Sequence, residues 1–392
     1  MRKLFYLSIQ LPLYLLISIG LMGAQASAES GLTEAELGQI LFLDTNFSAN
    51  RTMSCATCHD PSKIFTDHRD NAGKRMVSLG DDGKALGTRN TPMATYANTS
   101  PSFHFDKVLN EYVGGQFLDG RADTLAIQAM GPPLNLVEMG LPHAGLLVER
   151  LQENPFYVTN FKRLYGDKVF DSKQTDTDFP AFNGFARAIE AFEKTNAFSS
   201  YDSKYDRFLK GEYELTVLED LGRTLFFSNN NVSCNSCHML KVEDSKKEPF
   251  TNHQYRNIGV PSNQQLLALG HLKADFIDHG LLENPAVDDP KYDGKFKNPS
   301  LRNVAVTAPY MHNGVFKELR TVMEFYDHYN NTERKINPET GKPWRSPEVP
   351  NTVDKEDLTG HALTDRKIDA LVAFMKTLTD KRFESLLIPE KK

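Results

Sequence analysis

Two short segments of the chain carry cysteine and histidine at the same spacing. Residues Cys55–His59 have the sequence Cys-Ala-Thr-Cys-His, and residues Cys234–His238 have the sequence Cys-Asn-Ser-Cys-His. The 392-residue chain contains four cysteines, so these two segments account for all of them. Two thiols separated by two residues and followed directly by an imidazole are the pattern by which c-type haem is attached to protein.

Covalent haem attachment explains why the spacing is so short. The two thiols can add across the two vinyl groups of one haem, and the adjacent imidazole then becomes the proximal ligand of the iron. A redox-active dithiol would not need the histidine, and a Cys/His zinc site would need further ligands. The sequence therefore predicts two covalently bound haem c groups, held by Cys55, Cys58, His59, Cys234, Cys237 and His238.

A similar helix is expected just before each haem segment, over Thr33–Phe42 and over Thr216–Phe226. Both stretches begin with Thr-x-x-Glu, which is a capping box that starts a helix. Both continue with Leu-Gly and end with Leu-Phe, which places an apolar side towards the haem. This repetition predicts two related domains with a boundary in the polar stretch Tyr201–Glu212.

Helical patterns dominate elsewhere, and long strand patterns are few. We expect a helix that begins at Asp123 as its N-cap, runs to Met130 and ends at Gly131-Pro132-Pro133, and further helices over 182–194 and 364–378. Residues 63–90 and 262–298 are rich in Gly, Asp, Asn and Lys and are expected to be loops. The predicted fold class is mainly α, with two cytochrome-c-like haem domains and long loops.

The beginning of the chain has the features of an export signal. Arg2 and Lys3 precede an uncharged stretch over 4–22, and Ala26-Ser27-Ala28 has the small residues of a cleavage site. We therefore expect a signal peptide over 1–28, a periplasmic protein and no stable membrane insertion once the signal is cleaved. An uncleaved membrane anchor is the alternative. The formal net charge of −6 does not favour nucleic-acid binding.

The sequence resembles the bacterial di-haem cytochrome c peroxidase superfamily, which includes MauG, over nearly the whole chain after residue 28. Besides the haem segments, the resemblance rests on Phe-Leu-Asp-Gly-Arg-Ala at 117–122, on residues 131–140, on Pro-Ser-Leu-Arg-Asn at 299–303 and on Thr-Ala-Pro-Tyr-Met-His-Asn-Gly at 307–314. It implies an N-terminal peroxidatic haem domain over 29–205 and a C-terminal haem domain over 206–392.

The resemblance also implies roles around the first haem, which binds peroxide in the family. Typical peroxidases close this haem with a distal histidine from a Ser-x-Gly-His stretch, and the matching residues here are Ser-Leu-Gly-Asp at 78–81. An open haem is therefore expected, with His68 as the alternative ligand. Glu138 matches the distal acid that relays a proton during O–O cleavage. Gln128 and Pro132 match other positions of the distal pocket.

At the second haem, the family's distal ligand comes from the helix after the Pro-Tyr-x-His-x-Gly motif. Peroxidases place methionine there, and the matching residue in this chain is Tyr326. Tyrosine is the MauG-like arrangement, in which a phenolate stabilises oxidised iron. The alternative is that Tyr326 belongs to the core and Met323, one turn earlier, is the ligand.

The resemblance further implies calcium between the haems, bound by Asn90, Thr307 and Pro309, of which two would contribute backbone carbonyls. The family commonly has tryptophan between the haems, but this chain has Leu118. Leucine cannot be oxidised, so coupling between the haems must follow another path or be weaker. Trp344, Tyr310 and Tyr329 are possible electron-relay residues, with an ordinary packing role as the alternative for each.

The leading hypothesis is a periplasmic di-haem oxidoreductase of MauG type. It would use hydrogen peroxide to form high-valent haem and would oxidise a Trp or Tyr of a partner protein. The first alternative is a peroxidase that detoxifies peroxide with electrons from a small cytochrome or cupredoxin. The second alternative is an electron-transfer cytochrome without peroxidase turnover, which Glu138 and an open first haem argue against.

Overall fold

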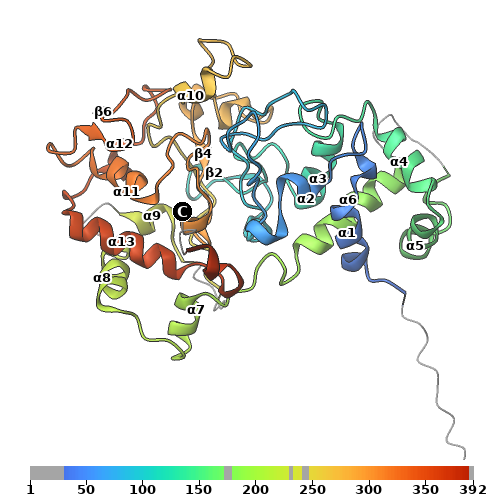
Figure 1. The fold of residues 1–392 in the computed structure, drawn as a ribbon, viewed down its shortest axis with the longest axis horizontal. Helices are drawn as coiled ribbons and strands as arrows, with labels where there is room; N and C mark the ends of the chain where they lie inside the picture. The colour runs from blue at the N-terminus through green and yellow to red at the C-terminus, as the bar shows by residue number, and fades with distance from the viewer. Residues whose placement is uncertain (1–30, 172–178, 229–232, 241–246, 388–392) are drawn as a thin grey trace, which may run out of the picture. The chain divides into compact units, whose positions relative to one another are not determined.

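The structure is a computed structural model that describes residues 31–171, 179–228, 233–240 and 247–387 (Figure 1). The predicted signal peptide over 1–28 lies outside these residues. None of the described helices is both long and apolar enough to cross a membrane. The described helices are α1 Glu34–Leu43, α2 Cys55–Cys58, α3 Leu125–Leu134, α4 Ala144–Gln152, α5 Pro155–Tyr165, α6 Pro180–Glu193, α7 Lys204–Leu209, α8 Val217–Phe226, α9 Cys234–Cys237, α10 Gln264–Leu267, α11 Leu319–Asp327, α12 Lys355–Leu358 and α13 Asp365–Thr377.

Strands are short and pair locally, which confirms the mainly α fold class. The described strands form antiparallel pairs, namely β1 His104–Asp106 with β2 Glu111–Val113, β3 Tyr255–Arg256 with β4 Phe296–Lys297, and β5 Ile336–Asn337 with β6 Lys342–Pro343. Of these described pairs, only β3–β4 joins segments that are far apart in the sequence, and it lines the same cavity as the second haem segment. The regions 63–90 and 262–298 consist mostly of loops, as expected.

The predicted repeat of a capped helix is confirmed. Thr33 caps α1 and Thr216 caps α8, each in a capping box with the glutamate three residues later. The glycine of each Leu-Gly pair lies where its helix crosses a second helix (Figure 1). A Cβ on Gly38 would lie 1.8 Å from the carbonyl oxygen of Ala188 in α6, and a Cβ on Gly222 would lie 1.9 Å from that of Ala370 in α13. Only glycine permits these two close crossings.

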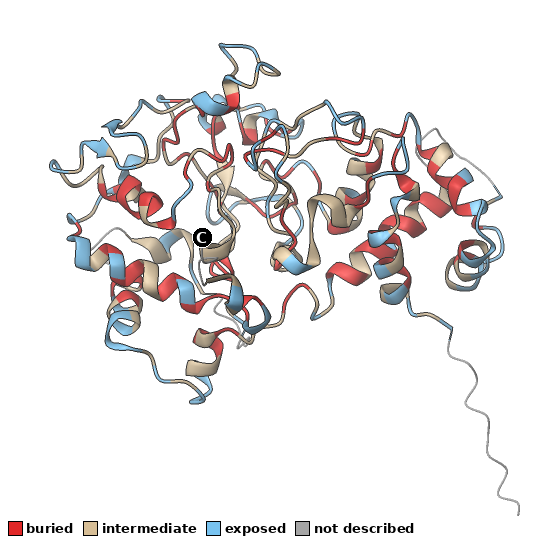
Figure 2. Cartoon of the chain, in the orientation of Figure 1, coloured by how far each residue is buried: buried red, intermediate tan, exposed pale blue. Residues whose placement is uncertain are grey.

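Two hydrophobic cores follow from these helix pairs (Figure 2). The first core contains buried residues between Leu37 and Phe198 and is built on α1, α4, α5 and α6, with α3 packed beside them. The second core contains buried residues between Tyr205 and Leu378 and is built on α8, α11 and α13. The change from one core to the other falls in the stretch where the domain boundary is predicted, and the bounds 29–205 and 206–392 remain a prediction.

The stretch around that boundary is more ordered than its polar composition suggests. Asp206, in α7, is buried and accepts hydrogen bonds from the guanidinium of Arg302 at 2.8 and 2.9 Å. Arg302 is fully buried and stacks over Tyr201 at 4.6 Å. A buried charge needs such a partner, so the polar residues here form a packed contact with the 299–303 motif.

The helix predicted to begin at Asp123 differs from the expectation at both ends. Its N-cap is Thr124, and it continues through Pro132 and Pro133 to the end of α3. The two prolines remove backbone donors only from the last turn, where the lost bonds cost little. Their carbonyls remain useful, because that of Pro133 accepts a hydrogen bond at 2.8 Å from the backbone of Leu141.

We predict that Gly38→Ala or Gly222→Ala destabilises the folded protein by roughly 1–3 kcal/mol, because a new methyl group would meet backbone that cannot rotate away. Gly87→Ala is the control, since the nearest atom to a Cβ added there would lie 3.8 Å away and the φ of Gly87 is not positive. Urea unfolding of the haem-loaded variants measures the difference. Equal stability of all three variants would contradict the role given to the crossings.

Candidate haem sites

The two haem segments adopt the same local structure. In α2 and in α9, a single helical turn carries both cysteines, and the histidine follows as the C-cap. The backbone N–H of His59 donates to the carbonyl of Cys55, and that of His238 donates to the carbonyl of Cys234, both at 2.9 Å. This turn brings two thiols and one imidazole close together, as thioether attachment and proximal ligation require.

Both imidazoles are oriented by backbone carbonyls. Nδ1 of His59 lies 2.9 Å from the carbonyl oxygen of Phe65. Nδ1 of His238 lies 3.2 Å from that of Phe250 and 3.1 Å from that of Pro299. A proton held on Nδ1 leaves Nε2 free for iron, which is the usual arrangement around a metal-bound histidine. The sequence pattern did not reveal these carbonyls, because hydrogen bonds to backbone leave no side-chain signal.

Burial keeps the thiols of both segments in their neutral form. It raises the pKa of Cys55 to about 12 and that of Cys58 to about 11, and it also raises the pKa of Cys234 to about 12. No group of three or more His, Cys, Asp or Glu residues in the described part of the chain is arranged to hold a metal ion.

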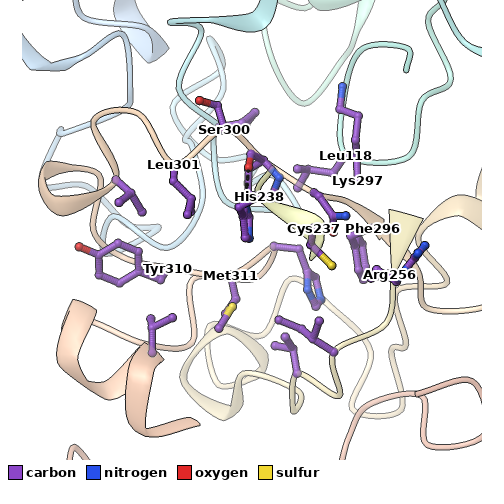
Figure 3. Close-up of a pocket in the computed structure, with 18 of the residues that line it drawn as sticks. Leu118, Cys237, His238, Arg256, Phe296, Lys297, Ser300, Leu301, Tyr310 and Met311 are labelled. Carbon is purple, nitrogen blue, oxygen red and sulfur yellow. Dashed lines mark hydrogen bonds between the residues drawn. The ribbon is translucent and has the colours of Figure 1, made fainter. Parts of the chain in front are cut away.

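The second haem segment opens into a cavity of about 350 Å³ (Figure 3). The sulfur-bearing Cys237 and the ring of His238 lie in its wall, and Leu118 and Lys297 lie beside each other on another side. The α11 residues Met323 and Tyr326, the two alternative ligands, both line the cavity. Met323 is a buried member of the second core, whereas Tyr326 packs at the edge of that core.

The lining of this cavity fits haem, which combines an apolar ring, two carboxylates and a ferric centre. The lining is mostly apolar, as with Leu301 and Leu371. Lys297 lies in the wall, where its amine donates to the Gly115 carbonyl and burial lowers its pKa to about 8. Burial raises the pKa of Tyr326 strongly, so a phenolate there requires a nearby cation such as iron.

Asp81, which the resemblance matches to the family's distal histidine, is hydrogen-bonded to residues of the chain itself. Its carboxylate accepts hydrogen bonds from Ser48 at 2.8 Å, Thr52 at 2.6 Å and the backbone of Asn50 at 2.5 Å. With these donors it is committed to holding the 48–52 loop, which leads into the haem segment. Asp81 therefore has a structural role that its place in the motif did not indicate.

Glu138 lies next to this loop because the backbone N–H of Asp81 donates to the Glu138 carbonyl at 2.8 Å. Burial raises the pKa of the Glu138 carboxyl, and the positive charge of Arg121 opposes that shift. A carboxyl with a raised pKa can both accept and release a proton near neutral pH. Arg121, in the 117–122 motif, was not expected at this site.

The other residues predicted at the first haem lie on two sides of the segment. Gln128 and Pro132 belong to α3, which packs on α6, and both are partly exposed. His68 instead hydrogen-bonds through Nδ1 to Thr66 at 2.8 Å. Thr66 follows Phe65, whose carbonyl holds the proximal imidazole, so His68 belongs to the proximal loop.

Asn90, Thr307 and Pro309, the predicted calcium ligands, line the same cavity as the second haem segment. The side-chain N–H of Asn90 donates to the Met76 carbonyl at 3.0 Å, and this bond does not use the side-chain oxygen of Asn90. Bringing together one amide and two residues of the 307–314 motif is consistent with an oxygen-rich cation site.

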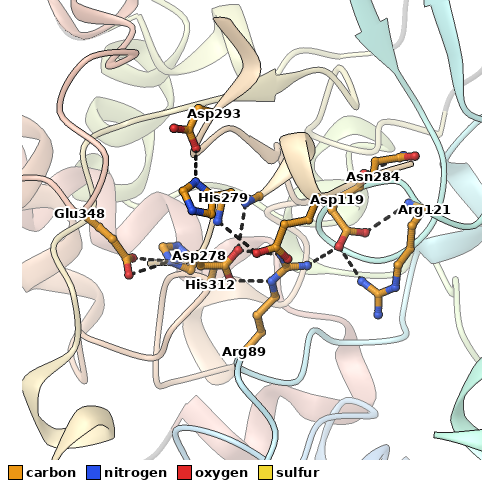
Figure 4. A network of polar contacts seen from close by, with 11 residues as sticks. Arg89, Asp119, Arg121, Asp278, His279, Asn284, Asp293, His312 and Glu348 are labelled. Carbon is orange, nitrogen blue, oxygen red and sulfur yellow. Dashed lines mark hydrogen bonds and ion pairs between the residues drawn. The ribbon is translucent and has the colours of Figure 1, made fainter. Parts of the chain in front are cut away.

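A charged network supports this region and is centred on Arg89, the residue before Asn90 (Figure 4). Arg89 contacts Asp119 at 2.5 Å and Asp278 at 2.6 Å, and Arg121 donates to the same Asp119 carboxylate at 2.6 Å. Nearby, His312 faces Glu348 at 3.3 Å. The 117–122 motif therefore joins Arg89, next to the predicted calcium ligand Asn90, with Arg121, whose positive charge acts on the pKa of Glu138.

Known proteins resemble this chain over nearly its full length. The family model for di-haem cytochrome c peroxidases matches residues 33–214. The methylamine utilization protein MauG of Paracoccus denitrificans is 48% identical over 381 residues, which cover 96% of each chain. The cytochrome c551 peroxidase of Pseudomonas aeruginosa is 31% identical over 293 residues, 73% of this chain and 69% of that protein.

Solved structures agree with these sequence matches. The di-haem peroxidase BthA of Burkholderia thailandensis superposes with a TM-score of 0.77 at 30% identity, covering 90% of this chain and 87% of that one. A MauG-like protein associated with microbial copper homeostasis gives 0.64 at 28% identity, covering 91% of each. The chain belongs to the di-haem cytochrome c peroxidase family and is a MauG-type oxidoreductase with two haem c groups.

Proposed function

We propose that this enzyme reacts with hydrogen peroxide at the His59 haem and takes electrons from a Trp or Tyr side chain of a partner protein, which is thereby modified. One observation carries the proposal. The residue at the family's distal-ligand position, Asp81, is bound to Ser48, Asn50 and Thr52 rather than directed at a haem. The 48% identity to MauG of Paracoccus denitrificans supports the same conclusion.

The chain's own residues have separate tasks in this reaction. Bound haem supplies an iron that binds peroxide and exchanges single electrons. His59 and His238 hold the two groups, each oriented by its Nδ1 hydrogen bond. The Glu138 carboxylate takes a proton from one peroxide oxygen and returns it to the other, which leaves as water. Gln128 and Pro132 shape the pocket around the peroxide.

Tyr326 is proposed as the distal ligand of the second haem, in preference to Met323. Its side chain lines the same cavity as Cys234, Cys237 and His238, which supports this choice. Met323 instead packs in the second core. A phenolate ligand stabilises oxidised iron, which favours storage of oxidising equivalents.

We also propose calcium at Asn90, Thr307 and Pro309, and a periplasmic location reached through the signal at 1–28. The cavity that the three residues share supports the first proposal. The thioether chemistry of two haem c groups and the export features of the sequence support the second. Partner and peroxide then meet the enzyme outside the cytoplasm.

A detoxifying peroxidase is the second candidate. Relatives named as cytochrome c peroxidases are 27–32% identical to the chain, and Met323 lines the second cavity. The two candidates differ in what the oxidised enzyme does alone, because a closed resting site needs one haem to be reduced before peroxide binds.

The first prediction is therefore that the fully oxidised, haem-loaded enzyme reacts with one equivalent of hydrogen peroxide in the absence of any donor. An optical titration should show a prompt shift of the Soret band followed by slow return. If the spectrum stays unchanged until one haem is reduced, the detoxifying peroxidase becomes the better description.

The second prediction concerns Glu138. Glu138→Gln should slow the peroxide-induced Soret change by roughly 10²–10⁴-fold, because the proton relay is lost. The working form is the carboxylate, so the wild-type rate should rise with pH through a pKa above that of an ordinary glutamate. This acid limb should vanish in the variant. Glu149→Gln, on the exposed side of α4, is the control and should behave as wild type.

The third prediction separates the two ligand candidates. Tyr326→Phe should raise the reduction potential of the His238 haem, because an oxygen donor that favours oxidised iron is removed. Met323→Leu conserves volume and should leave that potential unchanged. Spectroelectrochemical titration of both variants measures the potentials. A shift in the Met323 variant alone would assign the ligand to methionine.

A further inference from the structure

Tyr96 and Asp380 form a buried hydrogen-bonded pair that joins the two halves of the chain. The Tyr96 hydroxyl donates to one oxygen of the Asp380 carboxylate at 2.5 Å. Tyr96 is 1% exposed and Asp380 is fully buried. A length of about 2.5–2.7 Å is usual when a hydroxyl donates to an ionised carboxylate. The geometry therefore indicates a neutral phenol bonded to a carboxylate anion.

Contacts of Tyr96 reach both haem sites. The residue lines the cavity of the second haem segment together with His238. Its backbone N–H donates to the Phe198 carbonyl at 3.1 Å. The ring of Phe198 lies 4.0 Å from that of Phe65 between centroids, and the Phe65 carbonyl contacts Nδ1 of His59. Tyr96 therefore borders the space of one haem and is joined to the proximal histidine of the other through two packed residues.

The phenol of Tyr96 is held in one place. The backbone N–H of Tyr201 donates to its oxygen at 3.1 Å. The guanidinium carbon of Arg302, whose charge is paired with Asp206, lies 5.1 Å from the centre of its ring. Burial raises the pKa of Tyr96, so the phenol keeps its proton at neutral pH unless it is oxidised.

Asp380 is arranged to take that proton and to keep it. Burial raises the pKa of its carboxyl, so the Asp380 carboxylate is a stronger base than an exposed one. The side-chain N–H of Asn303 donates to its second oxygen at 3.0 Å, and the side-chain oxygen of Asn303 accepts from its backbone at 2.8 Å. Because Asp380 is fully buried, a proton received there stays beside Tyr96 and can return to it.

Oxidation of a phenol depends on such a base. A phenol that has lost an electron is a strong acid, so it is oxidised readily only when a base within hydrogen-bonding distance accepts its proton. Tyr329 and Trp344 differ in this respect. Their side chains donate to the backbone carbonyls of Ile258 at 3.0 Å and of Arg334 at 2.7 Å. A backbone carbonyl accepts a hydrogen bond but is too weak a base to take the proton.

We propose that Tyr96 is a redox-active residue that, with Asp380 as its proton acceptor, holds one oxidising equivalent as a neutral tyrosyl radical until a donor supplies an electron. The inference rests on the proposed function, which supplies hydrogen peroxide as the oxidant. Burial suits this task, because exclusion of water prevents side reactions of a reactive intermediate.

The electrons and protons of this step balance. Reduction of one hydrogen peroxide to two waters takes two electrons, and two protons from solvent. The haem sites supply one electron and Tyr96 supplies the other, while the O–H bond of Tyr96 breaks and its proton moves to Asp380. Two electrons from the donor later restore the haem sites and the phenol, and the proton on Asp380 returns to Tyr96.

Electron paramagnetic resonance of rapidly frozen samples tests the inference. The fully oxidised, haem-loaded enzyme is mixed with one equivalent of hydrogen peroxide and no donor. The wild type should give an organic radical signal that narrows when the enzyme is produced with ring-deuterated tyrosine, because couplings to ring protons are lost. Tyr96→Phe keeps the packed ring but removes the hydroxyl, and it should abolish this signal.

Two further variants test the proton acceptor and the location. Asp380→Asn keeps an oxygen that accepts the hydrogen bond but cannot hold the proton, and it should also abolish the signal. Tyr157→Phe is the matched control and should keep it. The Tyr157 hydroxyl also donates to a carboxylate at 2.5 Å, that of Asp44, but Tyr157 lies on α5, apart from α2 and α9 (Figure 1). Haem absorbance and urea unfolding show that each variant is folded.

The outcomes separate this inference from the proposed function. If peroxide shifts the Soret band but no tyrosyl radical forms, or if the radical persists in Tyr96→Phe, the inference is wrong and the proposed function stands. A radical that persists in folded Asp380→Asn overturns the role of Asp380 and with it the inference. If peroxide causes no Soret shift in the fully oxidised enzyme, the inference and the proposed function are both wrong.

Discussion

A hydrogen bond from each proximal imidazole to a backbone carbonyl is the contact on which both haem sites depend. The carbonyls of Phe65 and Phe250 hold Nδ1 of His59 and His238, so that Nε2 remains available for iron. Neither carbonyl is in the haem segment itself. Each is positioned because its own phenylalanine ring is buried, as where Phe65 lies 4.0 Å from Phe198 between ring centroids. The core that folds each half of the chain therefore also orients an iron ligand.

The duplication preserves this proximal arrangement, while the opposite sides of the two sites have diverged. The helix crossings at Gly38 and Gly222 are also alike in the two halves, because neither crossing leaves room for a Cβ atom. Beyond them, the first site places Glu138 beside a loop fixed by Asp81. The second site has a cavity lined by Tyr326. One proximal scaffold thus carries a buried carboxyl group near one haem segment and a cavity lined by aromatic side chains near the other.

Buried charges in this protein join segments that are far apart in the sequence. Arg302 with Asp206, and Arg89 with Asp119, are paired at hydrogen-bonding distance, and such pairs mainly determine which segments meet. Lys297 is stabilised differently, because burial disfavours its charge and its amine donates to the Gly115 carbonyl.

The haem attachment residues, the two capped helices and the mainly α class could be predicted from the amino-acid sequence, because each is encoded in residues close together in the chain. The spacing of Cys and His is a covalent requirement, and a capping box such as Thr33 with Glu36 is satisfied within one turn. Other features became visible only in the folded chain. The carbonyl of Phe250, the approach of Arg121 to Glu138 and the packing of Trp344 near Tyr326 all join segments separated in sequence. Such contacts form only when the two cores pack, so a local sequence pattern does not predict them.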